Sequence, residues 1–169
     1  ALRAALRQTP NTILLGEMRD FDTIQTALTA AETGQLLLST LHTLGAAKTI
    51  DRIIDTFPAN QQAQIRVQLS MVLKAVVSQQ LVPGIDGTLV PAFEVMIVTP
   101  AIANLIREGK IHQIDNVIFS SQEGGMQTMD NALLALFNAG RITRDSAIAY
   151  AQDKTTLSRK LKEKKLHVV

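Results

Sequence analysis

Short apolar runs and amphipathic segments alternate over the first 45 residues of the chain. Residues 12–16 and 36–41 form two such runs, and the first has the length expected of a strand that is buried on both faces. Between them lies a helical stripe of apolar residues that follows Asp22, a residue that can cap a helix, and that ends at Gly34. Strand, helix and strand at this spacing predict a parallel βαβ crossover.

The middle of the chain predicts two helices and an antiparallel hairpin. Apolar residues recur on one helical face over residues 46–57 and again over residues 60–79, which predicts a short helix and then a long one. Residues 80–82 and 89–98 have the character of strands, and the turn formers of residues 83–87 lie between them.

The remainder of the chain is predicted to be helical. Pro100 suits a first helical position, and helices are expected over residues 101–108, 111–119, 128–138 and 143–151. The chain is therefore expected to be an α/β part over residues 1–98, a small all-α unit over residues 99–152 and a basic tail over residues 153–169.

Composition and charge narrow the possible functions. The chain has 169 residues, of which 46% are hydrophobic and 19% charged, as in globular proteins, and no apolar run approaches the ~18 residues of a membrane span. The absence of cysteine excludes disulfides, thiol catalysis and cysteine zinc sites. Residues 154–165 carry six Lys or Arg and one Glu, whereas the rest carries 14 Asp or Glu against 11 Lys or Arg, so nucleic-acid binding is not expected. The basic run itself is interpreted as a solvated helix end.

The first residues do not resemble the start of a domain. Ala1 is not methionine, and residues 1–8 form a helical run with no capping residue before it. The sequence is therefore expected to be part of a longer, cytoplasmic protein.

Polar side chains follow both predicted parallel strands. Glu17 comes directly after the first strand and His42 directly after the second, and ligands of parallel sheets bind at the carboxyl ends of strands. Nucleoside triphosphatases place a carboxylate at such an end, and a histidine there can contact a terminal phosphate. The alternatives are an exposed carboxylate at a strand end and a histidine that caps the next helix. Another histidine, His112, is interpreted as a surface residue.

Several motifs carry a family resemblance. The segments 16–20, 30–34, 39–43 and 46–52 read GEMRD, AAETG, STLHT and AAKTIDR. Together with AIANLIRE at 101–108 and GMQTMD at 125–130, they closely resemble the secretion-type hexameric ATPases, and within that family the type IV pilus retraction branch. The resemblance implies a RecA-like P-loop NTPase core, here as a fragment with a parallel βαβ unit and an antiparallel hairpin, followed by a helical C-terminal unit.

The resemblance also implies roles for individual residues. Glu17 takes the acidic Walker B position, and His42 takes the conserved position of the histidine box. The residues expected near nucleotide and Mg²⁺ are Gly16, Arg19, Asp20, Thr40 and Thr43. The residues expected to face a partner are Asn104, Arg107 and Glu108, and no metal site made directly by a protein cluster is expected.

As a whole, the resemblance implies an ATP- and Mg²⁺-dependent motor that powers pilus retraction and twitching motility. Such motors are rings, usually of six subunits, that act on an inner-membrane platform protein from the cytoplasmic face of the membrane.

The chain departs from the family pattern at three points. Gln35 stands where a second histidine is usual, and Ala103 stands where an arginine is common. No GxxxxGK[ST] phosphate loop occurs in the 169 residues, so the isolated chain is expected to be inactive as an ATPase.

Two other functions remain open. Pilus-extension and type II secretion ATPases share the Walker B and histidine motifs but typically insert a tetracysteine segment after the long helix, and this chain has no cysteine and passes from Gln79 to Phe93 in a short hairpin. The other alternative is a protein-interaction module that does not use nucleotide.

Overall fold

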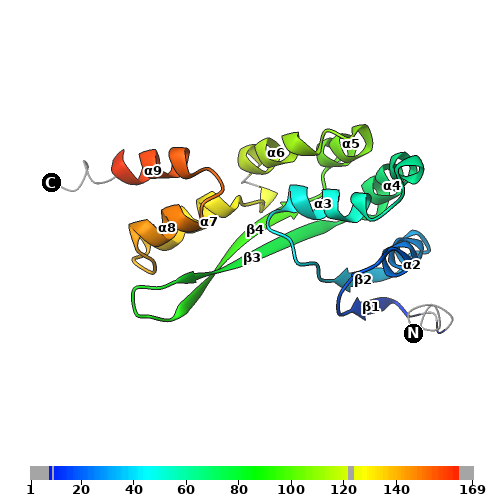
Figure 1. The fold of residues 1–169 in the computed structure, drawn as a ribbon, viewed down its shortest axis with the longest axis horizontal. Helices are drawn as coiled ribbons and strands as arrows, with labels where there is room; N and C mark the ends of the chain where they lie inside the picture. The colour runs from blue at the N-terminus through cyan, green and yellow to red at the C-terminus, as the bar shows by residue number, and fades with distance from the viewer. Residues whose placement is uncertain (1–7, 9, 122–123, 164–169) are drawn as a thin grey trace. The chain divides into compact units, whose positions relative to one another are not determined.

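The computed structural model describes residue 8, residues 10–121 and residues 124–163, and the element order is given in Figure 1. The helix expected over residues 1–8 lies outside the described residues, apart from residue 8. The chain forms two compact units, each built from separate stretches of sequence. The first contains residues 1–43, 47–74 and 98–114, and the second contains residues 44–46, 75–97 and 115–169.

A parallel strand pair forms the sheet of the first unit. Strand β1 (Thr12–Leu15) pairs with β2 (Leu36–Ser39) in a register that sets Thr12 opposite Leu36 and Leu15 opposite Ser39. Helix α2 (Phe21–Glu32) connects the two strands and packs on β2, and its buried side chains include Ile24 and Leu28. The predicted parallel βαβ unit is confirmed.

The prediction that the first strand is buried on both faces is wrong. Ile13 is buried, but Leu14 is 79% exposed, and on the neighbouring strand Leu36 and Leu38 are each about half exposed. Alternate residues of a strand point to opposite faces, and in the described part of the chain the face that carries these three leucines is open.

The predicted cap of α2 is also wrong. Asp20, not Asp22, is the N-cap residue, because its backbone is extended and its side chain accepts a hydrogen bond from the backbone N–H of Thr23. The helix therefore begins at Phe21, and Asp22 lies in its first turn. Gly34 follows the helix with φ of 97°, as predicted for the residue that ends it.

Three further helices, α3 (Ala46–Asp55), α4 (Ala59–Val72) and α5 (Pro100–Glu108), supply most of the apolar core of the first unit. Helix α4 packs against both α2 and α5. Helix α5 begins at Pro100, as predicted, and ends at Gly109 in the left-handed region. The buried side chains from these helices are Ile50, Ile53, Ile54, Ile65, Leu69, Ile102 and Ile106.

The long helix predicted over residues 60–79 is wrong in its second half. Helix α4 stops at Val72, and β3 (Ala75–Pro83) begins three residues later. Residues 76–82 alternate between more buried even positions and exposed odd positions, which is the two-residue period of a strand. Valines at 76 and 77 favour that conformation because β-branched side chains suit a sheet.

An antiparallel hairpin and helices form the second unit. Strand β3 pairs with β4 (Leu89–Ile97) along the full length of both strands, which confirms the predicted hairpin. Helix α7 (Met129–Asn138) contacts β4, and α8 (Arg144–Tyr150) contacts β3, as Figure 1 shows. The core between the hairpin and these helices includes Val82, Val90, Ala92, Met129, Leu133, Ile142 and Ala147.

The helix predicted at 111–119 is a 3₁₀ turn, η1 (Ile111–Gln113), followed by α6 (Ile114–Ser120).

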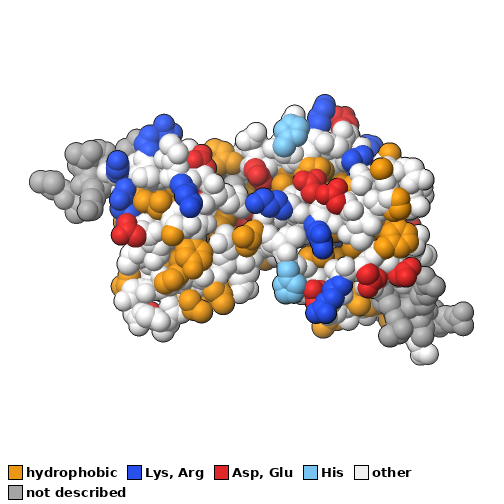
Figure 2. Space-filling model, in the orientation of Figure 1, with side chains coloured by type: hydrophobic (Ala, Val, Ile, Leu, Met, Phe, Trp, Pro, Cys, Tyr) orange, Lys and Arg blue, Asp and Glu red, His pale blue; other side chains and the backbone are white. Residues whose placement is uncertain are grey.

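The basic tail contains a packed helix rather than a solvated end. In α9 (Lys154–Glu163), Leu157 and Leu161 are each 1% exposed and belong to the core of the second unit. They lie four residues apart on one helix face, so the cations occupy the rest of the helix surface. Figure 2 shows these Lys and Arg side chains gathered over α9. The domain boundaries at residues 98 and 152 stay a prediction.

None of the helices in the described ranges combines the length and the apolar character that a membrane crossing requires.

Candidate functional site

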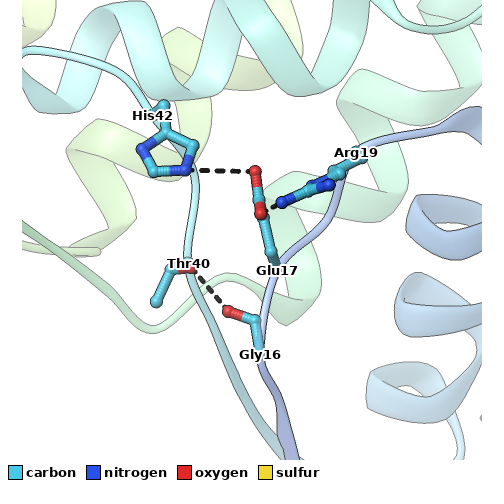
Figure 3. A network of polar contacts seen from close by, with 5 residues as sticks. All are labelled: Gly16, Glu17, Arg19, Thr40 and His42. Carbon is cyan, nitrogen blue, oxygen red and sulfur yellow. Dashed lines mark hydrogen bonds and ion pairs between the residues drawn. The ribbon is translucent and has the colours of Figure 1, made fainter.

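Two chain segments run side by side just beyond the carboxyl ends of β1 and β2. The hydroxyl of Thr40 donates to the carbonyl oxygen of Gly16 over 2.5 Å, and the backbone N–H of Met18 donates to the carbonyl oxygen of Thr40 over 3.1 Å. These bonds continue the parallel pairing beyond the strands and bring the residues that follow each strand to one edge of the sheet (Figure 3).

The carboxylate of Glu17 lies between two cationic or potentially cationic side chains, as Figure 3 shows. Its Oε2 accepts a hydrogen bond from Nε of Arg19 over 2.6 Å, and its Oε1 lies 3.2 Å from Nε2 of His42. The Glu17 side chain is 22% exposed, whereas those of Arg19 and His42 are 77% and 86% exposed. The prediction that Glu17 and His42 reach the same sheet edge is confirmed.

The other residues predicted near nucleotide lie around this pair but already have bonding partners. Asp20 caps α2, and the hydrogen bonds from Thr23 hold the pKa of its carboxyl below the usual value. The hydroxyl of Thr43 is 2.8 Å from that of Thr49. Gln35, at the departure from the family pattern, accepts a hydrogen bond from the Thr33 hydroxyl over 2.7 Å. A cap by an Asp at the start of a helix is ordinary helix chemistry, whereas the contact of Arg19 with Glu17 and the pairing of Thr43 with Thr49 depend on side-chain rotamers and on the turn into α3.

The motif over residues 101–108 lies in α5, as the predicted helix, and the helix divides into two faces. Asn104, Arg107 and Glu108 are exposed. Nη1 of Arg107 donates to Oδ1 of Asn104 over 3.0 Å, and a 2.8 Å ion pair with Lys110 holds the pKa of Glu108 below its usual value. On the packed face Leu105 is only partly buried, whereas both isoleucines of the helix are fully buried.

The signature at residues 125–130 fastens the start of α7 to the hairpin. Gln127 forms a two-way backbone bridge with Val95, and its side chain donates to the carbonyl oxygen of Phe93. Thr128 is the N-cap of α7, and its hydroxyl accepts from the backbone N–H of Asn131. The described contacts of this motif are therefore structural ones within the second unit.

Sequence reasoning missed Glu94, which is 1% exposed on β4. Its oxygens accept hydrogen bonds from the backbone of Ala46 and Met129 and from the side chain of Gln152. A signal was present, because Glu94 occupies the same alternating positions as the buried apolar residues of its strand. A carboxylate at a buried strand position needs hydrogen-bond partners. His112, by contrast, is exposed at η1, as predicted.

Comparison with known proteins finds sequence similarity to secretion and pilus proteins over most of the chain. The profile of the family described as type II/IV secretion system protein matches residues 1–88. The type IV pilus retraction ATPase PilT of Pseudomonas aeruginosa is 54% identical over 147 residues, which cover 87% of this chain and 43% of that protein. A twitching motility protein of Neisseria gonorrhoeae is 51% identical over 159 residues, which cover 94% of this chain and 42% of that protein.

The fold agrees with a solved structure of the same kind. The crystal structure of the pilus retraction motor PilT with bound ADP superposes with a TM-score of 0.85 at 47% identity, and the match covers 94% of this chain and 44% of that one. The chain thus spans less than half the length of the curated relatives it matches. Because the family profile covers more than half of the chain and the same segment holds both Glu17 and His42, the chain belongs to the type II/IV secretion system protein family.

Proposed function

We propose that this chain is part of a pilus retraction ATPase and carries two residues of its nucleotide site. Glu17 is the carboxylate that orients water, and His42 is the histidine that contacts the terminal phosphate. The observation that carries the proposal is the Glu17–His42 pair, which lies at the joint carboxyl edge of two parallel strands. Similarity to PilT and to a twitching motility protein over most of the chain supports the retraction branch.

Glu17 fits the role of a residue that orients water. Oε1 and Oε2 each contact one nitrogen, of His42 and of Arg19, and a carboxylate has about four acceptor positions, so lone pairs remain for a water molecule. Arg19 and His42 fix the direction of the carboxylate without burying it. Glu17 would accept a proton from water or hold a water ligand of the metal, and His42, being largely exposed, would donate to the terminal phosphate.

The residues present fit one side of a MgATP site. Mg²⁺ prefers oxygen ligands and keeps several waters, and a partly exposed carboxylate suits that chemistry. When bound, the magnesium ion would neutralise charge that develops on the phosphate oxygens. The 169 residues contain no GxxxxGK[ST] loop, so the cradle for the phosphates must come from sequence outside them.

The wider assembly belongs to the same proposal. A ring of six subunits would act on an inner-membrane platform protein from the cytoplasmic face, and Asn104, Arg107 and Glu108 of α5 would face that partner. Support comes from the exposed polar face of α5, whose side chains pair with each other or with Lys110 rather than with another helix.

Features of the chain also favour retraction over the related functions. It lacks cysteine, and β3 connects to β4 through only five residues, which leaves no room for a tetracysteine segment in that connection. An interaction module that does not use nucleotide would need no carboxylate between an arginine and a histidine at a strand edge.

A chimera tests the proposal. The segment of P. aeruginosa PilT that aligns with this chain is replaced by the chain, and steady-state MgATP hydrolysis is measured on the purified protein. We expect hydrolysis, and we expect Glu17→Gln to reduce turnover by about 10² while nucleotide binding persists, because the shape remains and the charge is lost. Turnover within twofold of the parent would return Glu17 to a structural role, and an Arg19→Gln variant controls for the loss of the ion pair alone.

A further inference from the structure

Glu94 is buried in the second unit, and both oxygens of its carboxyl group accept hydrogen bonds. Oε1 accepts a hydrogen bond from the backbone N–H of Ala46 over 2.7 Å. Oε2 accepts one from the backbone N–H of Met129 over 3.3 Å and one from the side-chain amide of Gln152 over 3.1 Å. Burying a carboxyl group without hydrogen bonds costs free energy, and Glu94 is only 1% exposed. These three donors offset that cost.

The three donors belong to three different segments of chain. Ala46 is the first residue of α3, Met129 is the first residue of α7, and Gln152 lies in the connection between α8 and α9. The first N–H groups of a helix have no acceptor within the helix, so one carboxyl group completes the starts of two helices. Asp130 fixes the third segment, because its oxygens accept from the backbone N–H groups of Gln152 and Asp153.

The peptide before Ala46 is packed closely against this group. Gly45 has φ of 93°, in the left-handed region that favours glycine. A Cβ placed on it would lie 3.2 Å from Nε2 of Gln152 and 3.5 Å from Oε1 of Glu94. Gly45 and Ala46 are both buried and belong to the second unit, while His42, three residues before Gly45, belongs to the first.

We propose that Glu94 is a positioning residue for His42. It anchors the Gly45–Ala46 peptide and thereby limits the freedom of the short segment that carries the histidine. This inference rests on the proposed function, since the reaction that His42 serves is the proposed hydrolysis of MgATP. A purely structural Glu94 would stabilise the second unit without affecting turnover.

Hydrogen exchange tests the anchor on the 169-residue chain itself. In Glu94→Gln the new NH₂ group cannot accept hydrogen bonds, and at the Oε2 position it would face two donors, the backbone N–H of Met129 and the side chain of Gln152, against the single N–H of Ala46 at the Oε1 position. The amide therefore turns its oxygen toward Gln152 and loses the bond to Ala46. We expect exchange of the Ala46 N–H to accelerate at least about tenfold beyond the change in global stability, as expected when a native hydrogen bond opens locally.

A reciprocal exchange of side chains sharpens the test. In Glu94→Gln with Gln152→Glu, the carboxylate at position 152 accepts the new NH₂ group, so the amide oxygen at position 94 faces Ala46 again. Protection of the Ala46 amide should return, whereas protection of the Met129 amide, which Glu94→Gln leaves in place, should now be lost. Gly45→Ala should accelerate exchange at Ala46 by an independent route. Leu133→Ala, a core change in the same unit, should lower global stability without a selective effect at Ala46.

ATP turnover by the PilT chimera distinguishes the two roles of Glu94. A purely structural role would leave turnover unchanged, whereas a positioning role would not. Glu94→Gln should lower kcat several-fold with KM for ATP nearly unchanged, and the reciprocal pair should restore kcat. Unchanged exchange at Ala46 in the Glu94→Gln chain would overturn the anchor. Accelerated exchange with unchanged kcat would overturn the positioning role. Accelerated exchange together with a parent chimera that hydrolyses no ATP would contradict the proposed function, and the catalytic role with it.

Discussion

The two side chains beside Glu17 orient it rather than stabilise the fold. Arg19 and His42 are mostly exposed, and ion pairs in water contribute little to stability because solvent screens them and long side chains lose freedom. Glu17 itself is held by short contacts on both oxygens. At the scale of single residues, these contacts therefore set the orientation of the Glu17 carboxylate and contribute little to the stability of the fold.

Replacing His42 distinguishes detection of the terminal phosphate by this residue from the hydrolysis of ATP itself. If His42 reports the terminal phosphate, His42→Ala in the PilT chimera should abolish twitching while basal ATP hydrolysis is largely retained, because Glu17 keeps its pairing with Arg19. The two quantities are measured on the same chimera, in cells and on the purified protein. If motility and hydrolysis both persist, the histidine serves only to shape the turn into α3.

The cap at Asp20 predicts a pH dependence at the start of α2. Hydrogen bonds from Thr23 to the carboxylate hold the pKa of Asp20 below its usual 3.8. Because the folded pKa is the lower one, the cap stabilises the helix above pH 3.8 and is lost as the pH falls through the folded value. An NMR titration of the Asp20 carboxyl carbon should give a midpoint below 3.8.

Asp20→Asn is the matched control for this titration, since asparagine also caps helices but does not ionise. The Thr23 amide signal should then lose its acid transition. A midpoint for Asp20 at or above 3.8 would contradict the cap.

At the scale of elements, α5 has one buried face and one exposed face. Ile102 and Ile106 are fully buried and pack the helix into the first unit, where α5 contacts α4. Asn104 and Arg107 are exposed and bond only to each other among the described contacts of their side chains. One face therefore holds the helix in place, and the other remains available.

Substitutions on the two faces of α5 should differ in kind. Asn104→Ala with Arg107→Ala removes both partners of one exposed hydrogen bond, so thermal stability should change by within about ±0.5 kcal/mol. Ile106→Ala should cost about 2–5 kcal/mol through a cavity. In the PilT chimera the double variant should hydrolyse ATP at the parent rate but not twitch, and normal twitching would remove α5 from force transmission.

The elements also show which features can be read from sequence. The parallel βαβ unit, the hairpin and the limits of α5 were predictable because apolar periodicity, Pro100 and the turn glycines mark them. The end of α4 was not, because residues 73–79 continue an apolar pattern that fits either a helix or a strand, and pairing with β4 decides it. Glu94 was missed because its hydrogen-bond donors come from segments that are distant in the sequence.

The same limit applied to the candidate site. That Glu17 and His42 meet follows from the order of two parallel strands, which sequence patterns reveal. That Arg19 shares the carboxylate, and that Thr43 pairs with Thr49, depends on side-chain rotamers and turn geometry.

At the scale of the whole molecule, two compact units share one continuous chain that passes repeatedly between them. The segment after the histidine enters the second unit at Leu44–Ala46 and then returns to the first in α3. Both proposals concern this segment: His42 serves the nucleotide, and Glu94 anchors the peptide that follows.

Pilus retraction by the PilT chimera tests the central claim most directly. A P. aeruginosa strain in which the chimera replaces PilT is scored for twitching, beside a strain without PilT and one with the Glu17→Gln chimera. The account predicts that the chimera restores twitching and that the Glu17→Gln chimera, although expressed and assembled to the same level, does not. Twitching restored equally by both chimeras, or a chimera that hydrolyses ATP but leaves the pili unretracted, would contradict it.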